Sequence, residues 1–193
     1  MDIDINAIAE KIHALELELD AELARRGAQL EYGLVHGKLI FENEVLRRHR
    51  AMKMSTWRYL KRANILIVLT APVIYSLIIP LVIFDLFLFA YQGICFPAYG
   101  IKRVKRSDYL VFDRHHLAYL NVIEKINCAF CSYANGLIAY AREIASLTEA
   151  YWCPIKHAVR LQGSHQRYRN FADFGDAAAH IKFVEEFDRR NKE

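Results

Sequence analysis

The chain has 193 residues, of which 54% are apolar and 25% are charged, and its net charge is +4 at neutral pH. This length suits one domain with extensions. The basic residues gather on both sides of an apolar segment and no recognition motif accompanies them, so we exclude nucleic acid as a partner.

The pattern divides the chain into regions 1–62, 63–101 and 102–193. The first region starts acidic and amphipathic, which predicts that no cleavable signal peptide is present. Its apolar residues recur at spacings of 3 and 4, as in the seam of a coiled coil: Ile5, Ile8, Ile12, Leu15 and Leu19. The seam covers about two and a half heptads, so we expect this helix to pack on another helix of the chain or on a partner.

Residues 30–42 read LEYGLVHGKLIFE, with apolar residues alternating on either side of His36 and Gly37. Alternation around a turn pair predicts a short β-hairpin. Residues 42–62 then return to a helical pattern rich in arginine and lysine, which leads into the apolar segment.

Residues 64–93 read NILIVLTAPVIYSLIIPLVIFDLFLFAYQG and predict a membrane location. One straight helix of this length would extend about 45 Å, against about 30 Å of hydrocarbon. Pro72 and Pro80 can each break a helix, and both flanks are basic, as cytoplasmic flanks are. We therefore favour a membrane-inserted helical hairpin with both ends in the cytoplasm, and the alternative is a single kinked span.

Asp85 is the one charged residue of this segment. A carboxylate in lipid is costly and faces protein, water or a partner. It could serve as a proton or ion relay, or it could lie near the interface or cap a broken helix. The segment holds no second charge to pair with it, so we favour the interface or cap.

The third region starts with a basic connector and continues with a long amphipathic pattern over 114–152. Apolar residues step by 4 and 3 from Tyr119 to Tyr151. This spacing predicts one long helix, or two helices with a break at Asn135 and Gly136. Pro154 should end the helix, and a final helix is expected over about 176–190.

Three of the four cysteines form the pattern C-x2-C-x21-C-x3-H in this region: Cys128, Cys131, Cys153 and His157. In a reducing compartment such thiols indicate metal binding or burial rather than disulfides. A Cys3His set is a tetrahedral site for zinc or iron. A four-sulfur set with Cys95 replacing His157 is the alternative, and it would need the chain to fold back from the interface.

The spacing raises a geometric difficulty for a single site. Across a continuous helix, Cys131 and Cys153 would lie about 33 Å apart. A helical hairpin broken at Asn135 would instead bring Cys153 and His157 near His115 and His116, splitting the ligands. Two chains could also share the ligands, or the cysteines could simply be buried thiols.

The blocks FDRHHLAYLNVIEKINC, CSYANGLIAYAREI and YWCPIKHA resemble segments of uncharacterised bacterial membrane-associated proteins, over residues 65 to about 160. This resemblance implies a bacterial origin and carries no function. Together with the basic flanks, it suggests the bacterial inner membrane, with the soluble parts facing the cytoplasm.

The sequence therefore predicts a mainly α protein with a membrane segment and a C-terminal helical domain. We expect a membrane-anchored metal-binding protein, holding zinc or iron (mononuclear or iron–sulfur), as a redox or accessory component. The alternatives are a non-catalytic scaffolding subunit with structural thiols and, more weakly, a monotopic enzyme on a lipid. The expected partners are anionic lipid headgroups, and a membrane protein or further copies of the chain.

Overall fold

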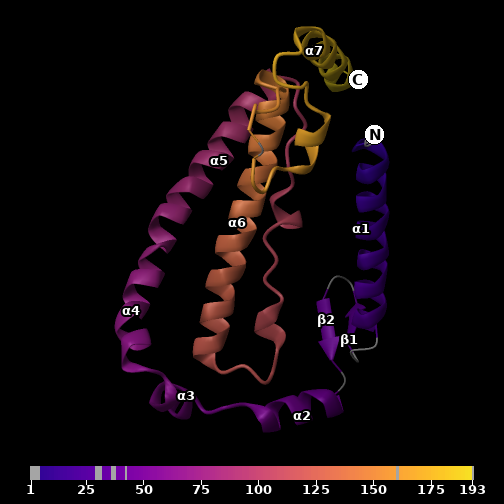
Figure 1. Ribbon diagram of the computed structural model, residues 1–193. Helices are drawn as coiled ribbons and strands as arrows, with labels where there is room; N and C mark the ends of the chain where they lie inside the picture. The colour runs from indigo at the N-terminus through magenta and orange to yellow at the C-terminus, as the bar shows by residue number, and fades with distance from the viewer. Residues whose placement is uncertain (1–4, 29–31, 36–37, 42, 160, 193) are drawn as a thin grey trace. The chain divides into compact units, whose positions relative to one another are not determined.

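The computed structural model describes residues 5–28, 32–35, 38–41, 43–159 and 161–192 (Figure 1). The protein is mainly helical, as the sequence predicted. The described residues form two compact units. One comprises the chain up to Tyr59 together with Asp113–Val122, and the other comprises Leu60–Phe112 together with the chain from Ile123 onward.

The first unit holds the N-terminal elements. Helix α1 spans Ile5–Ala28, where the heptad spacing predicted it. Strands β1 (Tyr32–Val35) and β2 (Lys38–Phe41) pair antiparallel, with Tyr32 opposite Phe41. The turn predicted at His36 and Gly37 lies outside the described residues. Helix α2 (Asn43–Met52) and the start of α3 (Thr56–Arg62) complete this part of the chain.

The apolar segment forms helices α4 (Ile65–Ser76) and α5 (Ile78–Ala98), which run in one direction (Figure 1). The two helices meet at Leu77, three residues before Pro80. Proline has no N–H, so the carbonyl of Ser76 loses its helical donor and the chain bends there. The backbone bond from Leu81 to Leu77 resumes the helix at 3.2 Å. The structure thus has the kinked single helix in place of the favoured helical hairpin.

Helix α6 spans Val122–Trp152 without interruption, so the alternative of a break at Asn135 and Gly136 is wrong. Gly136 lets the connector backbone pack closely against α6, and it does not form a turn. A Cβ there would lie 2.6 Å from the carbonyl oxygen of Tyr109 and 3.2 Å from the Cα of Leu110. The connector between α5 and α6 therefore crosses α6 at close range. Beyond the helix, Pro154 follows its end as expected.

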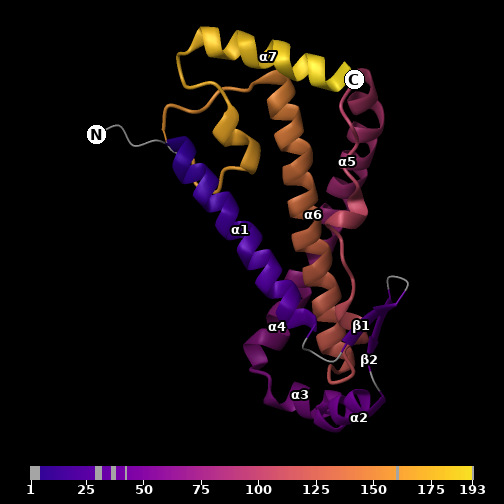
Figure 2. The same cartoon turned by 90° about the vertical axis from the view of Figure 1, so that its right-hand side faces the viewer.

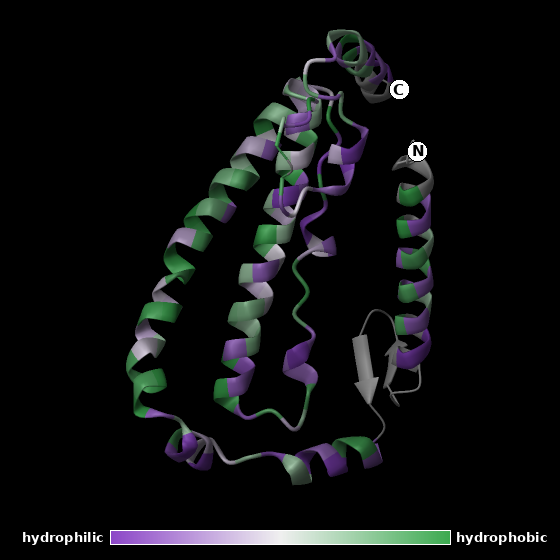
Figure 3. Ribbon diagram, in the orientation of Figure 1, coloured by the Kyte–Doolittle hydropathy of each residue, from purple (hydrophilic) through white to green (hydrophobic). Residues whose placement is uncertain are grey.

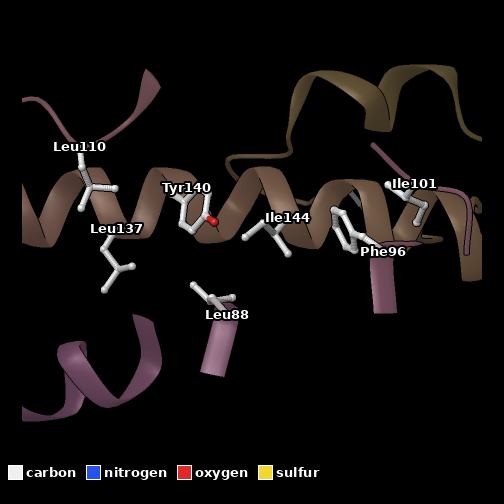
Figure 4. Packing of buried hydrophobic residues seen from close by; sticks show 7 residues of the cluster. All are labelled: Leu88, Phe96, Ile101, Leu110, Leu137, Tyr140 and Ile144. Carbon is white, nitrogen blue, oxygen red and sulfur yellow. The ribbon is translucent and has the colours of Figure 1, made fainter. Parts of the chain in front are cut away.

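The second unit is a sandwich of α5, the connector and α6. Helices α5 and α6 run parallel: Asp85 contacts Tyr133, Gln92 contacts Tyr140, and Tyr99 stacks on Tyr151. The connector runs back along both helices. Its core residues pack with those of both helices in a single cluster (Figure 4): Leu88 and Phe96 from α5, Ile101 and Leu110 from the connector, and Leu137, Tyr140 and Ile144 from α6.

The chain after α6 folds back onto that helix. Arg142 donates to the carbonyls of Gly163 and Ser164, and Arg167 binds Glu143 at 2.6 Å. Helix α7 (Ala177–Lys192) then lies across the C-terminal end of α6 (Figure 2). These contacts cover the polar side of the second half of α6.

Candidate functional site

A line of polar contacts joins α5 to the connector and α6, and it includes Asp85. Arg106 of the connector binds this carboxylate through both oxygens, with Nη2 at 2.6 Å and Nε at 3.3 Å. The hydroxyl of Tyr133 on α6 donates to the same carboxylate at 3.0 Å. The Asp85 side chain is 15% exposed. The structure thus supplies the charged partner that the apolar segment itself lacks.

Gln92 lies two turns further along α5 and is buried. Its amide oxygen accepts the N–H of Val104 at 2.5 Å, and its amide nitrogen donates to the hydroxyl of Tyr140 at 2.7 Å. A buried amide without partners would destabilise the fold. Arg103 adds a third tie by donating to the carbonyl of Gly93 at 2.9 Å. The connector is therefore fastened to α5 at successive points.

The surroundings shift the proton affinity of the groups on α6 and the connector. Burial raises the pKa of Tyr133, and its hydrogen bond to Asp85 raises it further. Burial also raises the pKa of Tyr140, although the hydrogen bond with Gln92 opposes the shift. The hydrogen bond to Asp85 raises the pKa of Arg106. The cluster therefore favours neutral tyrosines and a charged arginine, which is the state that holds the three elements together.

Sequence reasoning missed this cluster, although a signal for it existed. Asp85 and Gln92 are seven residues apart, as are Tyr133 and Tyr140. Matched heptads place such residues on one stripe of each helix. Arg106 was counted among the basic residues beside the membrane. Its distance of 21 residues from Asp85 gave no local pattern that would pair the two.

Helices α4 and α5 are predominantly hydrophobic, as Figure 3 shows. Ile65, Phe87, Phe89 and Ile94 are each 69–73% exposed. Among the described residues, Ile65–Ala98 is the one helix long and apolar enough to cross a membrane. Asp85 and Gln92 of this helix thus bind α6 and the connector, while large apolar side chains of the same helix stay exposed.

An apolar cavity of about 550 Å³ opens between α5 and α6. Its walls are Phe84, Leu88 and Tyr91 from α5, and Ala141, Ile144, Ala145 and Thr148 from α6, with Glu149, Trp152 and Cys153 at one end. Glu149 is its one charged residue and is already bound to His165 at 2.8 Å. The cavity offers space for an apolar group.

The structure does not bring the predicted metal ligands together. Cys128 and Cys131 lie in the first half of α6, and Cys153 follows its end. Because the helix is continuous, Cys131 and Cys153 are separated by about 33 Å along its axis. His157 turns to Tyr168, whose hydroxyl lies 3.1 Å from its Nδ1. A single site from these four residues of one chain is therefore not formed.

The lesser candidates also remain apart from a common site. Cys95 is half-buried on α5. His115 and His116 lie in a short 3₁₀ turn of the connector, with ring centroids 3.8 Å apart. The arrangement that would bring them to Cys153 required a broken α6, and α6 does not break. Within the described part of the chain, no three His, Cys, Asp or Glu side chains form a group that could hold a metal.

Comparison of the chain with protein-family models, with curated proteins and with solved structures found no match. The resemblance to bacterial membrane-associated proteins therefore stays a prediction. What the chain does must be argued from its own geometry.

Proposed function

We propose that this chain is a membrane-anchored assembly subunit, held in the lipid by the outward side of α4 and α5. The observation that carries the proposal is the sidedness of this long helix. Its Asp85 and Gln92 side chains bind the connector and α6, while its outward side presents large apolar side chains such as Phe87 and Ile94. Exposed apolar surface of this extent marks a membrane or protein contact.

The protein-facing side supports an anchored domain rather than an isolated span. The stretch Ile65–Ala98, which comprises α4, Leu77 and α5, has 34 residues and extends about 51 Å, which exceeds the hydrocarbon thickness of about 30 Å. From Tyr75 onward α6 contacts the helix, since the Tyr75 hydroxyl donates to Asn127 and its ring meets Phe130. Lipid would therefore surround α4 more completely than α5.

We place the soluble parts in the cytoplasm of a bacterium, at the inner membrane. The chain carries basic residues on both sides of the apolar helix, as cytoplasmic flanks do, and Lys61 and Arg62 end α3 just before it. The cysteines are free thiols, as expected in a reducing compartment. Lysine and arginine near the helix would attract anionic headgroups.

A redox or structural metal remains a prediction that would need ligands from two chains. Zinc or iron could be held by Cys128 and Cys131 of one chain with Cys153 and His157 of another. The assembly role, which rests on the exposed apolar helix, is the one we put forward.

Alkaline extraction of membranes tests the anchor. The full chain should stay with the membrane pellet. Replacing Leu86 and Phe87, which are 64% and 71% exposed, by lysine should release it, because each charge costs about 2.5–3.5 kcal/mol in the centre of a bilayer. Phe174→Lys is the matched control, since Phe174 is 70% exposed and lies outside the apolar helix.

Circular dichroism of each variant establishes that it is folded. Release of the double variant alone supports the proposal. Retention of that variant, or extraction of the unaltered chain, would overturn it.

A further inference from the structure

We infer that α1 is a pairing helix, and that its partner is α1 of a second copy of this chain. Helix α1 has 24 residues and carries an apolar stripe that stays open in the single chain. Ile8 and Ile12 are 47% and 50% exposed, and Leu15 and Leu19 are 63% and 57% exposed. Large apolar side chains in a stripe at this exposure need a covering surface.

The stripe has the register of a coiled coil. Ile12 and Leu19 occupy a positions, and Ile8 and Leu15 occupy d positions. Isoleucine at a with leucine at d, as in Ile12 and Leu15, favours two strands, whereas Leu19 at a and Ile8 at d have the reverse pattern. The seam ends at Glu22, which falls at d and is bound by Arg25 and Arg26 at 2.8 and 3.1 Å. The stripe therefore suits a short coiled-coil contact.

Charge on the flanks of the stripe argues for a second copy. Lys11 lies at a g position, Glu16 at e and Glu18 at g. In a parallel pair, g of one helix faces the following e of the other, so Lys11 meets Glu16. In an antiparallel pair g faces g, so Lys11 meets Glu18. In both orientations α1 is complementary to itself.

Pairing of this length is marginal for isolated helices in water. Two copies anchored in the same membrane have a raised effective concentration, which favours the contact. Pairing through α1 would be one way in which the proposed assembly subunit associates. The inference rests on the proposed function for the raised effective concentration that the membrane anchor provides. The contact surface itself is independent of the lipid-facing helix.

Sedimentation equilibrium of the full chain in density-matched detergent micelles tests the pairing. The chain should self-associate, and Leu19→Glu should raise the dissociation constant about tenfold or more, because it places a charge in the seam. Leu17→Glu is the matched control. Leu17 is also 57% exposed but lies at f, away from the seam, so the dissociation constant should stay unchanged.

Charge exchange identifies the orientation. Lys11→Glu should weaken pairing in either orientation. Adding Glu16→Lys should restore it in a parallel pair, and adding Glu18→Lys should restore it in an antiparallel pair. A monomer at all concentrations, equal effects of Leu19→Glu and Leu17→Glu, or restoration by neither exchange would overturn the inference.

The same variants are also tested by alkaline extraction of membranes. The inference expects them to stay in the membrane pellet. Loss of pairing in Leu19→Glu with retained membrane binding supports the α1 contact. An unaltered chain that stays in the pellet but is monomeric would count against the α1 contact and leave the membrane anchor standing.

Discussion

Asp85, on the apolar helix α5, and Arg106, on the connector that follows it, form an ion pair with their closest atoms 2.6 Å apart. This ion pair fixes the path of the connector along α5. Together with the bonds of Gln92 and Arg103, it fastens the connector to α5. A carboxylate that looked anomalous in an apolar segment is therefore part of the packing of the domain.

We expect Arg106→Ala to lower the free energy of unfolding by about 1–3 kcal/mol, the range for hydrogen bonds to charged groups. The Asp85 carboxylate would keep only the Tyr133 hydroxyl of its two described partners. Chemical denaturation in detergent measures the change. Lys105→Ala is the control, since Lys105 is an exposed neighbour on the same connector. Equal stabilities for the two variants would show that the ion pair does not hold the connector.

Stability should also fall in alkali. The folded-state pKa of Tyr133 is raised by burial and by Asp85, so the folded state keeps this proton at pH values where the unfolded chain releases it. The stabilisation is complete below the unfolded pKa of about 10 and is lost as pH rises from there through the folded pKa.

Tyr133→Phe should therefore show a shallower decline in unfolding free energy than the unaltered chain between about pH 9.5 and 11.5. Denaturation across this range measures both slopes. Parallel curves for the two proteins would show that the Tyr133 proton is not linked to folding.

Replacing two helical glycines by alanine should have opposite effects on stability. Gly136→Ala should destabilise the fold by about 1–3 kcal/mol through overpacking, since its Cβ would meet connector backbone at 2.6 Å. Gly93→Ala, whose Cβ would have nothing within 4 Å, should be neutral or raise stability by up to about 1 kcal/mol through helix propensity. Thermal melts compare the two. A stabilising Gly136→Ala would mean that the connector does not cross α6 there.

The thiols of α6 should be dispensable for folding. Cys131 is exposed and Cys128 is half-buried, so replacing both by serine should change the unfolding free energy by less than about 1 kcal/mol. Mass spectrometry of the anaerobically purified protein gives its metal content alongside. If the unaltered chain carries stoichiometric zinc or iron that the double variant loses, or if the variant unfolds, the thiols are ligands after all.

The periodic parts of the fold could be predicted from the sequence. The 3 and 4 spacing predicted α1, and the same spacing predicted α6 either as one long helix, which the structure has, or as two helices with a break at Asn135 and Gly136. Periodicity reports which side of a helix is buried. It does not report what covers that side, so Gly136 looked like a break until the connector was seen against it.

The candidate site was less accessible because its members come from three separate segments. Arg106 belongs to a basic run that also suits a membrane flank. Its ion pair with Asp85 becomes apparent only once the connector is seen to return along α5. The prediction of a single metal site from the cysteines was wrong for the opposite reason. Their spacing in sequence suggested a site, and the continuous helix holds Cys131 and Cys153 far apart.

Tryptophan fluorescence quenched by brominated acyl chains tests the lipid contact of α5 most directly. In a background with Trp57 and Trp152 replaced by phenylalanine, Phe87→Trp and Phe174→Trp report on positions that are 71% and 70% exposed. In reconstituted vesicles, we predict strong quenching for position 87 and none for position 174. Equal quenching at the two positions, or none at position 87, would contradict a lipid-facing α5.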